Sequence, residues 1–490
     1  MSQSYLRPRM PFDDVAWEKS EAVDDAWIAK LFKHETLFAI GQFIAKHHMG
    51  VPVELFSPVN GAFNVCLQMS FETGKSAMIR IARPGVSMFP EEKVRNEVAV
   101  MRYLQEHTAI PIPLILHWGT AKECPCNLGP FIIMEYAEHA LNISAALNTP
   151  GFVLEDRPIL DPNIAIDKLE HLYRQVADIL LQLSSISLPS IGSLVETEED
   201  KWEVKDRPLT FNMDSLVGLG TFPRSKLPKT TFKTSSSYFE ALAEMHINHL
   251  SHQRNDAIDN AIDCTRKYIG RHLFRKLARE SKLTSPEHNA GPFKLWCDDL
   301  RPTNILLNAD LKIVAVIDWE FTYSAPAEFS YAPPWWLLLE QPEYWPEGLD
   351  AWADAYEPRL EVFLRALRAR ENDAISRGTL SSKTTRLSEH MLQSWKSGDF
   401  RISYAARKSF AFDSVFWTQL DGRFFGTQKR QRGAIGAIED RVGYLSKEER
   451  EGMGAFVERK VKEMEDRVLA WEPEEEWVID NSDIDEVQKE

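Results

Sequence analysis

The sequence predicts an α+β protein with a small lobe of antiparallel strands and one helix, followed by a large, mainly helical lobe. Apolar and polar residues alternate over Phe63–Phe71, which is typical of a half-buried strand. A turn at residues 72–75 then leads into a second strand, Ala77–Ala82. After residue 140 the apolar residues recur mostly at helical spacing. The chain of 490 residues is long enough for a large core.

We expect the small lobe to cover residues 36–140, after an N-terminal extension at 1–35. Apolar residues in His34–His48 recur near every 3.6 positions and predict a helix. A second helix is predicted over Glu91–His107, where Glu97 interrupts the apolar stripe. Phe131–Tyr136 follows a Gly-Pro pair and is predicted to be the edge strand of the sheet.

The large lobe is expected over residues 141–472. Its clearest helix is Ile164–Ser185, and later helical patterns cover Tyr356–Arg370 and Ser446–Val468. Residues 195–235 are polar and rich in Thr, Ser, Lys and Pro, so we expect a long irregular connection there. The last segment, 473–490, is acidic and poor in apolar residues, which predicts disorder.

The segment from Leu295 to Glu320 contains the most informative motif. Asp299 lies five residues before Asn304, which opens a short apolar run. A turn at 308–310 and a second apolar run ending at Asp318 then predict a β-hairpin. Such a hairpin returns Asp318 to the end where Asp299 and Asn304 lie. Three oxygen-bearing side chains are therefore expected to converge.

This convergence favours phosphoryl transfer from a magnesium nucleotide. Mg²⁺ prefers oxygen ligands from one or two side chains together with phosphates. In kinase-type sites an Asp and an Asn bind the metal, and another Asp accepts the proton of the attacking hydroxyl. Asp299 is our candidate base, with Asn304 and Asp318 as metal ligands. The alternative is an ordinary hairpin whose polar residues cap its ends.

A nucleotide site also needs a cation for the phosphates and an acidic partner for that cation. Lys75, Arg80 and Arg83 are candidates. We favour Arg80, because a charge in the middle of a strand requires a partner. Glu97, on its apolar helix stripe, is the expected partner. The alternative is that Arg80 and Glu97 are solvated residues at the edge of their elements.

Two further segments are expected to contact ATP. The loop before the first strand contains Ser57, Asn60 and Gly61, whose side chains or N–H groups would surround the phosphates. With one glycine it is a weak glycine-rich loop. Backbone atoms of Glu135 and Tyr136, at the end of the predicted edge strand, would bind the adenine ring. Core packing explains these two residues equally well.

Composition restricts the partners. With 57 basic and 73 acidic residues the net charge is −16, which argues against nucleic acid because phosphate contacts need a basic surface. The charge is compatible with a cationic substrate or with a solvated acidic surface. No stretch approaches the ~18 apolar residues that span a membrane, and no targeting signal is evident. Five scattered cysteines indicate a reducing compartment, so we expect a cytoplasmic protein of unknown oligomeric state.

Over residues 36–330 the chain resembles the aminoglycoside phosphotransferase and choline-kinase-like family, a branch of the protein-kinase-like fold. It also looks similar to fungal phosphotransferase-family proteins of unknown substrate. The matching segments are Gly-Ala-Phe-Asn at 61–64, Ile-Arg-Ile-Ala-Arg-Pro-Gly at 79–85, Asn-Glu-Val at 96–98, Ile-Pro-Ile-Pro at 110–113, Met-Glu-Tyr at 134–136, Asp-Leu-Arg-Pro-Thr-Asn at 299–304 and Ile-Asp-Trp-Glu at 317–320. Cys297 stands where that family often has histidine.

The resemblance implies ATP and Mg²⁺ as cofactors and a small molecule with a hydroxyl group as acceptor. It implies Asp299 as catalytic residue, Asn304 and Asp318 as magnesium ligands, and Arg80 in place of the usual lysine beside Glu97. We expect the acceptor between the C-terminal helices and residues 321–336, where Tyr323, Trp335 and Trp336 could line a cleft.

The alternative function is a pseudokinase-like binding or scaffold module, since the histidine, the lysine and the glycine-rich loop are altered. A protein kinase is a weaker third reading, because no Ala-Pro-Glu segment follows the motif.

Overall fold

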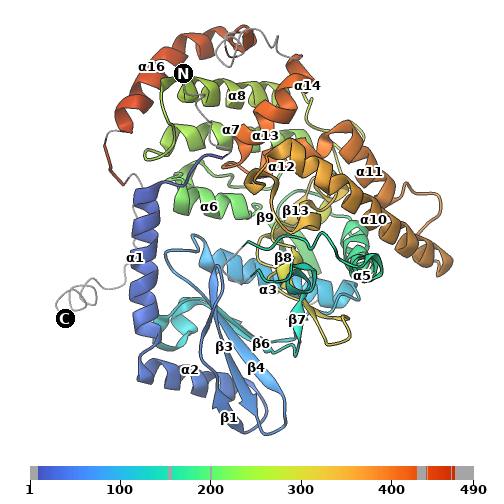
Figure 1. Ribbon diagram of the computed structural model, residues 1–490. Helices are drawn as coiled ribbons and strands as arrows, with labels where there is room; N and C mark the ends of the chain where they lie inside the picture. Colours follow the sequence, from blue (N-terminus) through green and yellow to red (C-terminus); the bar gives the residue numbers. More distant parts are fainter. Residues whose placement is uncertain are drawn as a thin grey trace.

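The computed structural model describes residues 9–152, 157–198, 201–426, 438, 440–464 and 466–469. It has the predicted α+β architecture of two lobes: in Figure 1 the sheet lies below and most helices lie above it. The expected tail at 473–490 lies outside the described residues. Within the described part of the chain, no helix is long and apolar enough to cross a membrane.

An antiparallel sheet forms the small lobe. Its strands are β1 (Pro52–Leu55), β2 (Val59–Asn60), β3 (Asn64–Phe71), β4 (Ser76–Ala82), β5 (Ile115–Gly119) and β6 (Phe131–Glu135). Their order is β1-β3-β4-β6-β5, with β2 also paired to β3. The prediction that 131–136 is an edge strand is therefore wrong. Its continuous apolar run reflects an inner strand, buried by neighbours on both sides.

Helices cover both faces of this sheet. One face packs on α1 (Asp14–Leu31) and α2 (His34–His47) through a core that includes Ile40, Leu67 and Ile79. The other face packs on α3 (Pro90–His107) and joins the core of the large lobe through Ile132 and Met134. The predicted helices in these regions are confirmed.

In its described residues the large lobe combines helices with two two-stranded sheets and one three-stranded sheet. Its helices are α4 (Ile143–Leu147), α5 (Ile166–Ser185), α6 (Phe211–Leu219), α7 (Ser235–His252), α8 (Ala261–Arg279), α9 (Ala327–Tyr331), α10 (Leu349–Ser376), α11 (Leu387–Ser397), α12 (Asp399–Arg407), α13 (Phe412–Val415), α14 (Asp421–Phe425) and α16 (Lys447–Glu463). Its strands are β7 (Leu141–Asn142), β8 (Ser193–Glu198), β9 (Lys201–Asp206), β10 (Lys294–Cys297), β11 (Ile305–Leu307), β12 (Ile313–Val316) and β13 (Thr322–Ala325).

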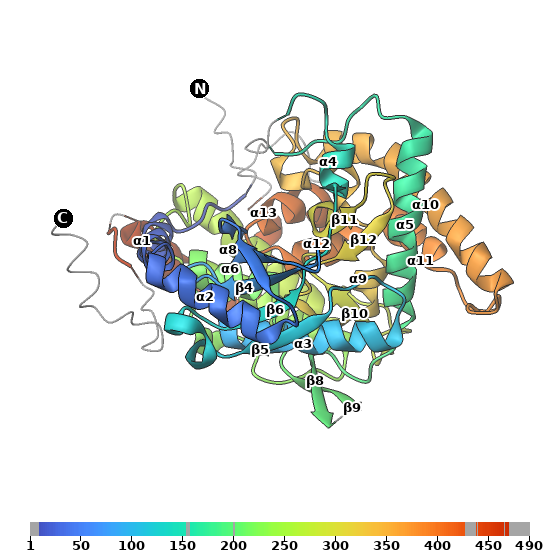
Figure 2. The same cartoon turned by 90° about the horizontal axis from the view of Figure 1, so that it is seen from below.

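The expected irregular connection at 195–235 is largely ordered, which corrects that prediction. It contains the hairpin β8–β9, which projects from the body of the molecule in Figure 2, and the helix α6. Trp202 and Val204 alternate with charged residues in β9, and this alternation is the signal of a half-buried strand. The high content of Ser, Thr and Lys outweighed that signal in the sequence analysis.

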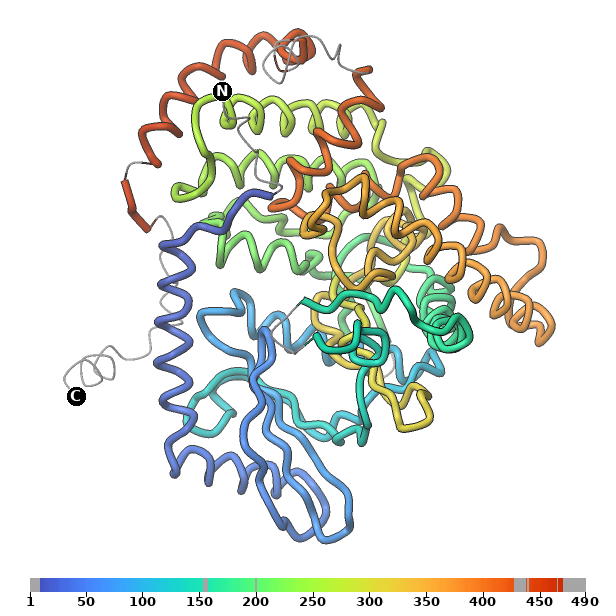
Figure 3. The backbone as a smooth tube through the Cα atoms, viewed as in Figure 1, coloured from blue at the N-terminus to red at the C-terminus, as the bar shows by residue number. Residues whose placement is uncertain are grey.

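Helix α1 connects the two lobes along one side of the molecule (Figure 3). Before the helix, the Met10 N–H donates to the Phe410 carbonyl at 2.8 Å, and the Asp13 N–H donates to the Leu219 carbonyl at 2.8 Å. Near the other end, Trp27 Nε1 donates to the Leu128 carbonyl at 2.6 Å. A Cβ on Gly85, whose φ is +80°, would lie 2.5 Å from the Ser20 carbonyl oxygen. Residues 9–31 of the expected extension thus pack on both lobes.

A buried carboxyl group at the lobe boundary makes stability depend on pH. Asp214 Oδ1 on α6 accepts the Met88 N–H at 2.8 Å, and burial raises the pKa of Asp214 from 3.8 to about 7. As pH rises from 4 to 7, the unfolded chain ionises here before the folded chain does, so folding loses free energy. Asp214→Asn keeps an acceptor oxygen for Met88 and is expected to be more stable than wild type by up to about 4 kcal/mol at pH 8.

Urea denaturation checks this expectation. The advantage of Asp214→Asn should grow from pH 5 to pH 8. Asp310→Asn, at an exposed position in the β11–β12 turn, is the control and should show no such trend. An equal effect of Asp214→Asn at both pH values would contradict the prediction.

Candidate active site

Strand alternation places the predicted cation between the lobes. Ile79 and Ile81 face α2, so Arg80 between them faces α3 and the large lobe. Arg80 Nη2 donates to Glu97 Oε2 on α3, and Nη1 donates to Asp318 Oδ1 after β12. Arg80 is 5% exposed and Glu97 1% exposed. The structure therefore brings together the expected Arg80 and Glu97 and adds Asp318 to the pair.

A second buried ion pair lies beside the first, and the sequence analysis missed it. Lys93 Nζ donates to Glu320 Oε2 at 2.6 Å and to Asn64 Oδ1 at 3.0 Å, while Asn64 Nδ2 donates to Glu320 Oε2 at 3.0 Å. Lys93 precedes Glu97 by one helical turn, so both project from the same face of α3. That i, i+4 spacing was the available signal. The two pairs fix α3 against the sheet and against residues 318–320.

The predicted hairpin positions the three oxygen-bearing side chains. Strands β11 and β12 pair with Ile305 opposite Val316, and the Ile317 N–H donates to the Asn304 carbonyl at 3.0 Å. Asp318 therefore returns beside Asn304. Asn304 Nδ2 in turn donates to Asp299 Oδ2 at 3.1 Å and to the Asp299 carbonyl at 2.8 Å. The arrangement expected from the motif is present.

The environment of Asp299 suits a proton acceptor. Burial raises the pKa of Asp299 from 3.8 to about 6, Arg301 opposes this rise and Asp318 adds to it. Arg301 Nε lies 3.0 Å from Asp299 Oδ1. A carboxyl group with this pKa is largely ionised at neutral pH, yet it is a better base than an ordinary aspartate.

Asp318 has a left-handed backbone conformation, with φ of 59°. Such a conformation is uncommon outside glycine and concentrates at functional sites. Burial raises the pKa of Asp318, whereas the Arg80 guanidinium opposes the rise. The Cys297 thiol lies 3.9 Å from the Asp318 carbonyl, so Cys297 supports the backbone of this segment.

The donor set fits Mg²⁺. Asn304 donates through its amide nitrogen, which leaves Oδ1 available as a hard oxygen ligand, and Asp318 follows Ile317, whose N–H donates to the Asn304 carbonyl. In the described ranges no group of three or more His, Cys, Asp and Glu side chains could hold an ion. Two protein oxygens are typical for Mg²⁺ that also binds substrate phosphates.

Comparison with known proteins identifies the family. Residues 70–367, more than half of the chain, match the model of the phosphotransferase enzyme family. The chain belongs to this family. It is 26% identical over 291 residues to clavilactone A biosynthesis cluster protein Y of Ampulloclitocybe clavipes, covering 56% of this chain and 62% of that relative.

Solved structures with similar folds include two kinases. A thermostable mutant of aminoglycoside phosphotransferase APH(4)-Ia, in ternary complex with AMP-PNP and hygromycin B, has a TM-score of 0.40 and 15% identity, covering 77% of this chain and 98% of that chain. An ethanolamine kinase of Plasmodium vivax has a TM-score of 0.41 and 12% identity, covering 92% and 97%.

The remaining residues predicted to contact a nucleotide lie at different places in the small lobe. Asn60 and Gly61 lie at an exposed turn closed by the Gly61 N–H, which donates to the Asn64 carbonyl at 2.8 Å. Ser57 lies between β1 and β2, away from that turn. Arg83 Nη1 donates to the Gly61 carbonyl at 2.7 Å and pairs with Asp24, so Arg83 holds the turn against α1.

At the other end of the sheet, the backbone N–H groups of Glu135 and Tyr136 already donate hydrogen bonds within the protein. Glu135 donates to the Leu114 carbonyl at 2.9 Å, and Tyr136 donates to the Ser76 carbonyl at 2.9 Å. These two N–H groups therefore stabilise the sheet. An adenine ring at this position would have to form its hydrogen bonds with other backbone atoms, in the segment between β6 and β7.

A cavity of about 180 Å³ opens beside Asp299. Trp335 lines it, as expected for the acceptor cleft. Trp336 and Tyr323 are buried in the core, where Tyr323 packs near Tyr238 with ring centroids 6.4 Å apart. Trp336 and Tyr323 therefore do not line this cavity, which corrects the expectation for these two residues.

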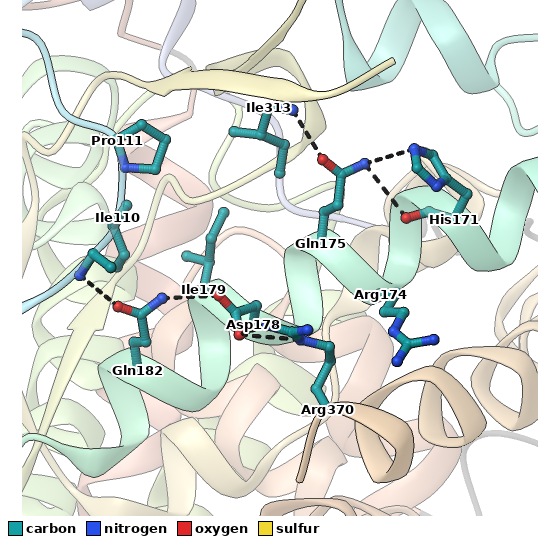
Figure 4. A pocket seen from close by; sticks show the side chains of 11 residues that line it. Ile110, Pro111, His171, Arg174, Gln175, Asp178, Ile179, Gln182, Ile313 and Arg370 are labelled. Atoms are coloured by element: carbon teal, nitrogen blue, oxygen red, sulfur yellow. Dashed lines mark hydrogen bonds and ion pairs between the residues drawn. The ribbon is translucent and has the colours of Figure 1, made fainter. Parts of the chain in front are cut away.

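A separate cavity of about 290 Å³ lies between α5, β12 and the loop after α3 (Figure 4). Its charged side chains are satisfied within the protein: Asp178 pairs with Arg370, and Arg174 pairs with Asp373 at 2.7 Å. Gln175 Oε1 accepts the Ile313 N–H at 2.9 Å. None of the predicted site residues lines it, so we assign it a structural role.

Proposed function

We propose that this chain is an ATP- and Mg²⁺-dependent phosphotransferase that moves the γ-phosphoryl group to a hydroxyl of a small molecule. The observation that supports this most is the cluster of Asp299, Asn304 and Asp318 next to the buried Arg80–Glu97 pair. In kinases these side-chain types bind nucleotide phosphates and metal and orient the attacking hydroxyl.

Each residue has a defined task in this proposal. The acceptor hydroxyl donates to the Asp299 carboxylate, its oxygen forms the new O–P bond, and its proton passes to Asp299 as ADP leaves. Asn304 and Asp318 would hold Mg²⁺, which supplies charge neutralisation at the phosphates. Arg80 has five N–H donors, so it retains donors for phosphate oxygens beyond those used by Glu97 and Asp318.

Thermal unfolding in the presence of ligand tests the nucleotide site. Mg·ATP at 100 times its Kd is expected to stabilise the wild type by about 2.7 kcal/mol, which raises Tm by several degrees. Asp318→Ala should abolish this shift, because it removes a metal ligand and a partner of Arg80. Asp310→Ala, in the exposed turn, is the control and should keep the shift.

Two outcomes would reject this proposal. One is an equal shift with ATP in EDTA and with Mg·ATP, because the metal would then have no role. The other is a full shift in Asp318→Ala. A Mg·ATP shift without any transfer of phosphate, even to water, would instead favour the non-catalytic binding module.

A further inference from the structure

The cavity beside Asp299 is unusually rich in cations for a chain of net charge −16. Its charged lining residues are Arg9, Arg301, Arg407, Lys408, Asp298, Asp299 and Glu343. Four of these side chains are basic, and one of the three acidic ones is the candidate base. The remaining wall is largely aromatic, with Phe12, Phe211, Trp335, Tyr344 and Phe410.

Some of these charges are already neutralised within the protein. Arg407 Nη1 lies 3.5 Å from Asp298 Oδ1, and Arg407 Nε donates to the Ser403 carbonyl at 3.1 Å. Asp298 also accepts Trp296 Nε1 at 2.8 Å, so it supports the cavity wall rather than the chemistry. Glu343 Oε2 accepts the Tyr404 hydroxyl at 2.6 Å, and burial raises the pKa of Glu343.

Arg9 and Lys408 form no ion pair with a described carboxylate, although the Arg9 guanidinium lies over the Phe12 and Tyr344 rings, 5.1 and 4.8 Å from their centroids. Arg9 Nη1 is buried and has no hydrogen-bond acceptor, although the adjacent Met10 N–H is fixed to Phe410. Lys408 Nζ forms no direct hydrogen bond or ion pair within the described part of the chain and lies 5.2 Å from the Phe211 ring centroid, while the carboxyl groups of Glu343, Asp298 and Asp299 act on it at longer range. Burial lowers the pKa of Lys408. A buried donor without an acceptor is costly, so Arg9 Nη1 favours an anionic ligand in this cavity, which Lys408 also lines.

We infer that the phosphate acceptor carries an anionic group, a carboxylate or a phosphate, which binds Arg9 and Lys408 while its hydroxyl faces Asp299. This inference rests on the proposed function. The aromatic wall fits a flat or apolar body between the two groups. A volume of about 180 Å³ is below the roughly 300–1,000 Å³ of pockets for drug-sized ligands, so the acceptor is small. This inference departs from the expected cationic acceptor.

Calorimetry with three matched alcohols tests the inference on the full chain with Mg·ADP bound. The probes are a hydroxymethylbenzoate, its neutral primary amide and a hydroxymethylbenzylamine, which differ mainly in charge. The benzoate is expected to bind at least about tenfold more tightly than the amide, and the amine should bind most weakly. Inorganic phosphate serves as a fourth probe and should compete with the benzoate.

Variants assign the preference to named residues. Lys408→Met should abolish the difference between benzoate and amide, and Arg9→Met should reduce it. If Lys408→Met fails to fold, Arg9→Met still decides the question. Lys122→Met, at an exposed position in the small lobe, is the matched control and should keep the full preference. Tightest binding of the amine, a preference that survives in Arg9→Met and Lys408→Met, or no binding of any anion would overturn the inference.

Phosphate transfer to the same probes separates this inference from the proposed function. Transfer to the amine that requires Asp299 would overturn the anion site and support the phosphotransferase. Binding of the benzoate without any Asp299-dependent transfer, to the probes or to water, would overturn the phosphotransferase and support the anion site.

Discussion

Replacing Asp299 by Asn is expected to lower kcat for phosphoryl transfer by about 10²–10⁴-fold, the usual contribution of a general base. The Asn side chain preserves the size of the residue and an oxygen for Asn304 Nδ2, which now donates to Asp299 Oδ2 at 3.1 Å. It cannot accept the proton of the hydroxyl. Radiolabelled ATP measures the transfer, into an acceptor or into water, and Kd for Mg·ATP should change little.

The pH profile separates a base from a positioning group. Because the pKa of Asp299 is about 6, wild-type kcat/KM should rise as pH passes through 6 and level off above it. The rise should disappear in Asp299→Asn. An Asp310→Asn variant should retain it. Wild-type activity of Asp299→Asn at neutral pH would exclude Asp299 as the base.

Replacing Lys93 by Met is expected to destabilise the fold by about 3–5 kcal/mol, because it leaves a buried carboxylate without its cation. Lys93 is 1% exposed and Glu320 is 2% exposed, so water cannot replace the lost partner. The pKa of Glu320 lies below its ordinary value because Lys93 and Arg80 outweigh the effect of burial. Urea denaturation at pH 7 measures the loss.

Two further variants test this explanation. Lys93→Met combined with Glu320→Gln should recover much of the lost stability, since no unpaired charge remains. Lys276→Met breaks the exposed Lys276–Glu280 pair, which has a similar distance of 2.8 Å and exposures of 42% and 44%. It should cost at most about 1 kcal/mol. A loss of similar size in Lys93→Met and Lys276→Met would refute the role of burial.

The sequence predicted those parts of the site that depend on local spacing. The interval between Asp299 and Asn304, together with the hairpin, was sufficient to place Asp318 beside them. Strand and helix periodicity also identified Arg80 and Glu97, because each was a charge at a position expected to be buried. These are regularities within about 25 residues of chain.

Contacts between distant segments could not be predicted in this way. Arg9 and Lys408 line one cavity although nearly 400 residues separate them, and no periodicity relates them. Lys93 shares a helix face with Glu97, but nothing in the sequence relates it to Glu320, 227 residues away, until the fold brings them together. The inner position of β6 likewise depends on β5, which precedes it but pairs on its outer side.

The attachment of α1 at both ends restricts how the two lobes can move relative to each other. Residues 10 and 13 are bonded to the large lobe, and Trp27 is bonded to the small lobe, so the chain crosses between the lobes on this side as well as before β7. These two crossings, along α1 and before β7, define an axis about which the lobes could rotate. Twisting or lateral sliding of the lobes would break these bonds, and rotation about that axis would break the Arg80–Asp318 and Lys93–Glu320 pairs, so we expect the lobes to keep one relative orientation until these pairs open.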